Sequence, residues 1–141
     1  FTEYDEGGRS FTLSADSFEI RNKKVRFFRT AMLKEAVMEN VKLDFYQDNQ
    51  WASSIQGQQA VMDVARMAAL FTGAVTIRAR GDKSLESESL SWSRQTGAIR
   101  VDGSFVYREG KKTIQGTGLY TDNNLATLNF LQPADNPQNV N

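Results

Sequence analysis

The chain has 141 residues, with 17 basic and 17 acidic side chains, no cysteine and no histidine. This length suits one domain with a modest core, and the balanced charge offers no electrostatic footprint for nucleic acid. The absence of cysteine and histidine excludes disulfides, thiolate metal sites and Ser-His-Asp or Cys-His catalysis.

The beginning of the chain, Phe1 to Gly8, is acidic and turn-rich, which favours a lead-in or a loose edge strand. No run approaches the roughly 18 apolar residues of a membrane span. Because the chain begins at Phe1 rather than Met, a targeting or anchoring segment could lie ahead of it.

A pattern of the form apolar–x–small–x–x–apolar–x–x occurs four times, at residues 13–20, 55–62, 85–92 and 114–121. The central small residues are 42, 30 and 29 positions apart, and a period near 30 predicts a fold that stacks one supersecondary unit. After the small residue the inward-facing phase slips by one position, which requires a bulge or a bend. We therefore expect each copy to be a strand that bends from one sheet toward another. The predicted bends lie at Ala15, Gly57, Ser87, Gly116 and Gly118.

A second pattern, strict alternation of apolar and polar residues, occurs at 40–45, 71–77 and 99–107. Alternation with period two predicts strands with one buried face. The positions predicted to face inward are Val75, Ile77, Val101 and Phe105, and those predicted to face outward are Thr76, Arg100 and Asp102.

Clusters of Gly, Asn, Asp, Arg and Lys separate these runs and are typical of hairpin loops. They occur at 21–24, 80–83, 93–97, 108–111 and 122–124, the last of them followed by a further predicted strand at 125–128.

Two stretches, 30–38 and 61–70, contain good helix formers at helical spacing. Both lie where the repeat requires strand or turn, so we favour strand and expect tertiary context to override helix propensity. A short helix at 25–38 or 61–70 remains the alternative. Residues 132–141 are polar and contain Pro133 and Pro137, which predicts a flexible tail after a single domain over 1–131.

Two features deserve comparison with catalytic motifs. Glu86 and Glu88 could form a carboxylate pair for glycoside hydrolysis, but such a pair is more typical of the solvent face of a strand. The Gly116-Thr117-Gly118 run lacks the third glycine and the following helix of a phosphate loop. We therefore predict a protein that is not an enzyme and that uses no cofactor and no metal.

The order and spacing of the motifs resemble those of the OstA/LptC superfamily of lipopolysaccharide-transport proteins, over about residues 1–131. The unit Leu-x-Ser-x-x-Leu-x-Trp, turn, Ile-x-Val-x-Gly-x-Phe-x-Tyr at 85–107 is similar to the repeat of that family. The Phe-Thr-Gly-Ala-Val-Thr-Ile run at 71–77, the early strand at 8–16 and the Gly-x-Gly-Leu element at 114–119 also resemble family elements. The LptC-like members are the most similar.

The resemblance implies an all-β fold, an incomplete and twisted V-shaped β-jelly roll of two antiparallel sheets. It implies a periplasmic component, anchored to the inner membrane by an N-terminal segment, that carries lipopolysaccharide between its sheets. It also implies docking of the N-terminal edge on the periplasmic domain of an inner-membrane ABC transporter and of the C-terminal edge on an LptA-like protein. Roughly twelve extra residues at about 25–38 depart from the family pattern.

The lead hypothesis is thus a lipid carrier and docking module, although the aromatic residues taken alone are more typical of an ordinary core. Residues predicted to line the lipid groove are Leu13, Phe18, Val41, Leu43, Ile55, Phe71, Val75, Ile77, Leu90, Trp92, Val101, Phe105 and Leu119. Three alternatives remain open: an LptA-like periplasmic bridge, a structural β-solenoid that assembles through its edges into homo-oligomers, and a carbohydrate-binding sandwich.

Overall fold

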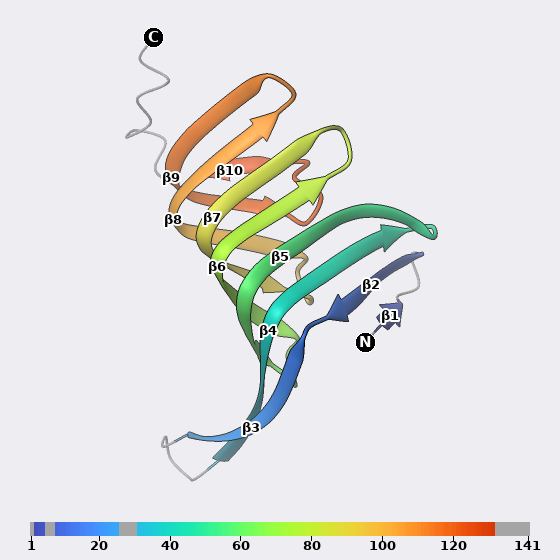
Figure 1. The fold of residues 1–141 in the computed structure, drawn as a ribbon, viewed down its shortest axis with the longest axis vertical. Helices are drawn as coiled ribbons and strands as arrows, with labels where there is room; N and C mark the ends of the chain where they lie inside the picture. Colours follow the sequence, from blue (N-terminus) through green and yellow to red (C-terminus); the bar gives the residue numbers. More distant parts are fainter. Residues whose placement is uncertain (1, 5–7, 26–30, 132–141) are drawn as a thin grey trace.

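The computed structural model describes residues 2–4, 8–25 and 31–131, and every regular element in these ranges is a β-strand (Figure 1). The ten strands are β1 (Thr2–Tyr4), β2 (Arg9–Ser14), β3 (Ser17–Val25), β4 (Ala31–Gln47), β5 (Gln50–Asp63), β6 (Ala68–Ala79), β7 (Lys83–Ser93), β8 (Ala98–Glu109), β9 (Lys112–Asp122) and β10 (Leu128–Phe130). The all-β prediction is confirmed. The predicted tail, 132–141, lies outside the described residues.

All strand pairs are antiparallel and belong to one hydrogen-bonded sheet in the order β1-β2-β4-β5-β6-β7-β8-β9-β10, with β3 also paired to β4. From β4 to β10 each strand pairs with the next one in the sequence, as expected for a chain of hairpins. The turns predicted at 80–83, 93–97 and 108–111 connect β6 to β7, β7 to β8 and β8 to β9.

A line of irregularities crosses the middle of the long strands. The β5–β6 ladder shifts register between Gln56 and Gln59, and the β6–β7 ladder shifts between Thr72 and Val75. Comparable shifts follow in the β7–β8 and β8–β9 ladders. Figure 1 shows the long strands curving at mid-length from a front layer into a back layer. The predicted two sheets are therefore the two halves of one sheet that bends along this line into an incomplete jelly roll.

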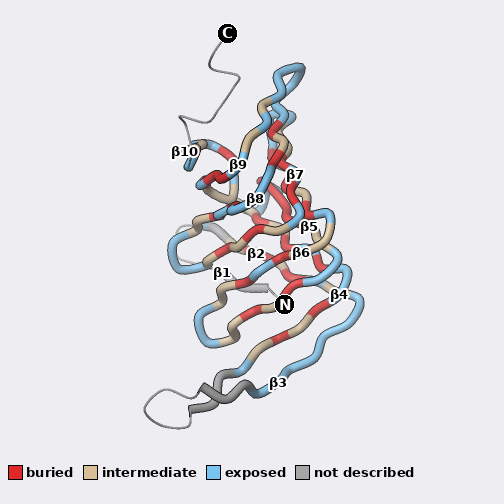
Figure 2. Tube along the Cα trace, turned by 90° about the vertical axis from the view of Figure 1, so that its left-hand side faces the viewer, coloured by how far each residue is buried: buried red, intermediate tan, exposed pale blue. Residues whose placement is uncertain are grey.

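The bend explains how the inward phase slips without exposing the core. Ile55 and Ala60 of β5 are both fully buried although an odd number of positions separates them. Ser87 and Leu90 of β7 show the same slip across the bend. A strand of constant pleat would turn one member of each pair outward, so the irregular residues between them return the side chains to the inner face. Figure 2 shows buried positions recurring along the strands of both layers.

The two stretches with helix formers are strand and turn, as predicted. Residues 61–63 end β5, residues 68–70 begin β6, and a turn joins them. Residues 31–38 belong to β4, whereas 26–30 lie outside the described residues. Ala36 and Met38 in β4 are buried at alternate positions, as are Ala60 and Met62 in β5. This is the periodicity of a strand, so packing on the inner face overrides helix propensity.

The wider spacing between the first two copies of the bend pattern has a simple structural basis. β4 is 17 residues long, and its pairing with β5 begins only at Glu35, opposite Asp63. The residues before Glu35 continue along β3, which pairs with β4 from Ser17 to Val25. The extra residues therefore extend one hairpin beyond the stack instead of adding a strand to it.

The core lies between the two layers and contains side chains from both. The ring of Trp92 in β7 packs against Phe11 of β2 at 5.6 Å and against Phe45 of β4 at 5.7 Å between centroids. Near the other end of the sheet, Phe105 of β8 stacks on Phe130 of β10 at 6.0 Å. Aromatic contacts of this kind join layers that backbone hydrogen bonds do not.

Candidate functional site

All but one of the thirteen predicted groove residues are buried on the inner face of the bent sheet. They come from β2 and from every strand between β4 and β9, so a continuous apolar surface runs along the inside of the molecule. None of these twelve is more than 6% exposed, and Leu13 is the one that reaches this value. Their burial places them between the layers, and contact with a lipid stays a prediction.

Phe18 is the exception, because its side chain is 59% exposed. It lies directly opposite the buried Met38 of β4, so the two residues share a face of the sheet. Among the described strands, however, β3 pairs with β4 alone, and no neighbour covers the far side of Phe18. Phe18 is therefore exposed because β3 lies at an edge of the sheet, and its contact with a lipid stays a prediction.

The five predicted bend residues lie on or beside the line of irregularities. Ala15 falls in the break between β2 and β3, and Gly57 lies within the shift between Gln56 and Gln59. The hydroxyl of Ser87 lies 3.0 Å from the carbonyl oxygens of both Ser89 and Ser104, so it links the bends of β7 and β8. Gly116 still pairs with Phe105, and the bend of β9 follows at Gly118, whose φ of 84° favours glycine.

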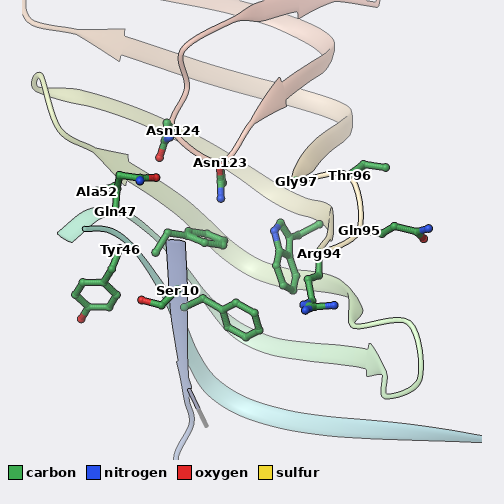
Figure 3. Close-up of a pocket in the computed structure, with 13 residues that line it drawn as sticks. Ser10, Tyr46, Gln47, Ala52, Arg94, Gln95, Thr96, Gly97, Asn123 and Asn124 are labelled. Carbon is green, nitrogen blue, oxygen red and sulfur yellow. The ribbon is translucent and has the colours of Figure 1, made fainter. Parts of the chain in front are cut away.

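A cavity of about 460 Å³ opens where strand ends of the two layers meet (Figure 3). On one side lie Ser10 of β2 and the β4–β5 hairpin, including Gln47, and on the other the β7–β8 turn and the β9–β10 loop. Phe11, Phe45 and Trp92 supply its apolar surface. The cavity lies near the strand ends, although Trp92 directly follows the irregular part of β7, and the prediction of bends gave no indication of the cavity.

Trp92 has an unusual polar atom. Its side chain is 3% exposed, and its indole Nε1 is buried. Among the described residues, this is the buried side-chain polar atom that has no hydrogen-bond partner. Leaving a buried donor unpaired costs on the order of 1–3 kcal/mol. Trp51 differs, because it is exposed and its Nε1 donates to Asp44 Oδ1 at 3.1 Å.

The β9–β10 loop, residues 123–127, closes the C-terminal end of the space between the layers. Oδ1 of Asp122 accepts the backbone N–H groups of Asn124 at 2.8 Å and Ala126 at 3.1 Å, and Oδ2 accepts that of Thr127 at 3.2 Å. This folds Leu125, at φ 55°, into the core, where it is 1% exposed. The sequence predicted a turn at 122–124 but a strand at 125–128; only 128 is strand, and the Asp-Asn-Asn run was the available signal for the turn.

Two contacts hold this loop to the other layer. Lys83 Nζ of β7 donates to the Leu125 carbonyl oxygen at 3.4 Å, and Ser53 Oγ of β5 donates to Asn124 Oδ1 at 3.5 Å. Both donors lie near strand ends of the layer opposite the loop. The loop therefore bridges the layers on one side of the cavity.

The charged groups of the described residues do not converge on a reactive centre. Glu86 and Glu88 are both exposed, and Glu86 forms an ion pair with Arg108 at 3.2 Å. Burial and a 2.8 Å hydrogen bond donated to Glu109 raise the pKa of Tyr107 to about 12, so it is a neutral structural group at physiological pH. Within the described ranges, no cluster of acidic side chains is suited to hold a metal ion.

The comparison with known families agrees with this geometry. The family described as lipopolysaccharide-assembly, LptC-related, matches residues 1–135. No curated protein sequence matches the chain. The part of the chain that the structure describes contains no helix long and apolar enough to cross a membrane. The family serves transport across the periplasm in cell-envelope biogenesis. With nearly its whole length matched, the chain belongs to the LptC-related family and is a component of lipopolysaccharide transport.

Proposed function

We propose that the protein holds the acyl chains of lipopolysaccharide between its two layers and passes the lipid along a series of docked jelly rolls. The observation that carries this proposal is the apolar inner face, which continues from β2 to β9 without a charged side chain among the buried residues that the structure describes. Apolar burial is the main term that favours binding of acyl chains, and an enclosed surface limits their contact with water. Family membership supports lipopolysaccharide as the lipid.

Both ends of the sheet support docking by strand addition. At the N-terminal end, β3 pairs with β4 alone and exposes Phe18 and Ile20, at 59% and 50%. At the C-terminal end, β10 pairs with only residues 119–121 of β9, and Lys112–Thr117 has β8 as its one described partner. Open edges with unpaired backbone groups accept a strand from another protein. We assign the N-terminal edge to the periplasmic domain of the inner-membrane ABC transporter and the β9 edge to an LptA-like protein.

We further propose that the domain works in the periplasm, anchored to the inner membrane by a segment that precedes Phe1. The full-length gene product tests this assignment. A single apolar segment just before Phe1 would support the anchored, LptC-like role. A cleavable signal peptide there would instead support an LptA-like bridge.

Site-specific photocrosslinking in cells tests the lipid-carrying function. A photoreactive residue at Phe71, Ile77, Trp92 or Phe105, all buried on the inner face, should give lipopolysaccharide adducts. The matched control is Arg78, which follows Ile77 on the exposed face of β6 and should give none. If none of the four inner positions gives an adduct, the carrier role is ruled out.

The open edges also favour a second candidate, a structural protein that assembles by its edges. Sedimentation of the purified domain over a concentration series separates the two functions. Growing filaments would support assembly, whereas monomers or small discrete oligomers would support docking on other proteins.

A further inference from the structure

The β9–β10 loop, residues 123–127, is braced by hydrogen bonds of its own. Besides the three backbone N–H groups that the Asp122 carboxylate accepts, the N–H of Leu125 donates to the Asp122 carbonyl oxygen at 3.1 Å. The Thr121 hydroxyl donates to the Thr127 carbonyl oxygen at 2.6 Å and so joins the two ends of the loop. β10 then returns to pair with β9. The loop is therefore a preformed unit attached to β9.

The polar contacts that the structure describes between this loop and the opposite layer are longer. Lys83 Nζ lies 3.4 Å from the Leu125 carbonyl oxygen, and Ser53 Oγ lies 3.5 Å from Asn124 Oδ1. Both distances exceed the range of well-formed hydrogen bonds, which is about 2.7–3.2 Å for N–H···O and about 2.5–3.0 Å for O–H···O. The loop thus separates from the opposite layer by breaking weak contacts, whereas it separates from β9 only by breaking strong ones.

One side chain of the loop enters the core. Leu125 is 1% exposed and belongs to the core cluster, while its neighbours Asn124, Ala126 and Thr127 are exposed. The φ of Leu125 is 55°, a left-handed conformation that is unfavourable for leucine, so burial of the side chain is what holds the backbone in this shape. The apolar link between the loop and the core therefore depends on this side chain.

We infer that residues 123–127 form a latch, which closes the space between the layers at this end and opens by withdrawal of Leu125 while the loop stays attached to β9. Asn123 and Asn124 of the latch also line the cavity, so withdrawal enlarges that opening. A state that differs by one buried side chain and two weak contacts is populated at roughly 0.1–10%. The inference rests on the proposed lipid-carrying function for its purpose, and it adds the residue that controls access to the inner face.

Methyl relaxation dispersion on the native chain tests the latch without a ligand. We expect the methyl groups of Leu125 to exchange between a buried and an exposed environment on the microsecond-to-millisecond timescale, as lids do. Leu90 is the matched control, because it is 2% exposed and lies within β7, and its methyl groups should show no such exchange. The same behaviour at both leucines would overturn the inference, since Leu125 would then open only with the rest of the core.

Substitution of Lys83 tests what holds the latch closed. Lys83→Met keeps the alkyl stem and removes Nζ, so it should raise the open population of Leu125 by about two- to tenfold, as the loss of one hydrogen bond implies. Lys111→Met is the control, because Lys111 is an exposed lysine in the β8–β9 turn, and it should leave this population unchanged. An equal response of the two variants would contradict a restraint by Lys83.

Uptake of the uncharged fluorophore N-phenyl-1-naphthylamine measures access to the inner face. Leu125→Ala should accelerate uptake severalfold, whereas Leu90→Ala removes the same atoms from the core within β7 and should not. Equal rates for the two variants would refute the latch, and if Leu125→Ala does not fold, the relaxation dispersion of the native chain decides. Photocrosslinking at Ile77 separates the two proposals. Lipopolysaccharide adducts there, in a protein whose Leu125 does not open, would refute the latch and leave the carrier function, whereas an opening latch without adducts would refute the carrier function alone.

Discussion

At the scale of single residues, Tyr107 combines burial with a hydrogen bond to a carboxylate. Its side chain is 2% exposed, and its hydroxyl donates to Glu109 Oε1 at 2.8 Å. Both effects disfavour the phenolate, and they raise the pKa to about 12 from the usual value near 10.

A pH dependence of stability follows from this shift. The native state holds the Tyr107 proton more tightly than the unfolded state, so its contribution is fully present below pH 10 and is lost as the pH rises toward 12. We expect a loss on the order of 2–3 kcal/mol across this window. Urea unfolding of the native chain and of Tyr107→Phe at several alkaline pH values measures it. Parallel pH profiles for the two proteins would contradict the assignment.

Gly73 shows why the bend line requires particular residues. Its φ is 83°, and a Cβ there would lie 2.6 Å from Gln58 Oε1 and 2.8 Å from Gln58 Cβ. We expect Gly73→Ala to destabilise the fold by about 1–3 kcal/mol, because it combines a strained backbone with a steric clash.

Gly103 provides the matched control for that substitution. It lies in β8 beside the same line, has no positive φ, and a Cβ there would meet nothing within 4 Å. Gly103→Ala should change stability by less than about 1 kcal/mol in either direction. Similar melting temperatures for the two variants would show that the bend tolerates side chains at Gly73.

At the scale of elements, the β9–β10 loop depends on one carboxylate. Asp122 accepts three backbone N–H groups that would otherwise lack a partner within the loop. Removing it should release Leu125 from the core and loosen the pairing of β10 with β9.

We therefore expect Asp122→Ala to lower the free energy of unfolding by about 2 kcal/mol, since hydrogen bonds to charged acceptors are among the stronger ones. Asp102→Ala is the control: Asp102 forms an exposed ion pair with Arg100 at 2.6 Å, and such surface pairs contribute at most about 1 kcal/mol. Hydrogen exchange should also accelerate at residues 128–130 in the first variant alone. Unchanged exchange there would mean that β10 is held by its packing on Phe105 rather than by the loop.

At the scale of the whole molecule, lipid entry between the layers requires them to separate where they meet. Ser53 of one layer and Asn124 of the loop approach within 3.5 Å, and the chain has no cysteine of its own. A Ser53→Cys, Asn124→Cys double variant therefore offers a single cross-link between the layers. Oxidised protein should take up lipopolysaccharide at least severalfold less well than the reduced form, because the link holds the layers together.

Ser53→Cys alone controls for the loss of the hydroxyl and should not respond to oxidation. Equal uptake by the oxidised and reduced double variant would show that the lipid enters without separation of the layers at this point.

Much of the fold could be predicted because it depends on the order of apolar, polar and small residues within short runs of the sequence. Alternation at 71–77 and 99–107 identifies strands and their inner faces, and the phase slip after Ser87 indicates a bend within a strand. Residues 61–70 have helix propensity, but the repeat pattern of the flanking segments requires strand or turn there, and this pattern was the better guide. The pattern predicted bends at both Gly116 and Gly118, and it did not indicate that the irregularity of β9 would lie at Gly118.

The rest depends on which segments meet in space. The sequence alone determined the strands, their inward faces and the approximate positions of the bends, since these follow from side-chain periodicity and small residues. Only the tertiary structure placed Phe18 at an uncovered edge and folded Leu125 into the core. It also brought Phe11, Phe45 and Trp92 together around an unpaired indole N–H. These three residues are far apart in the chain, and their contact arises because one sheet bends back on itself, which no local pattern encodes.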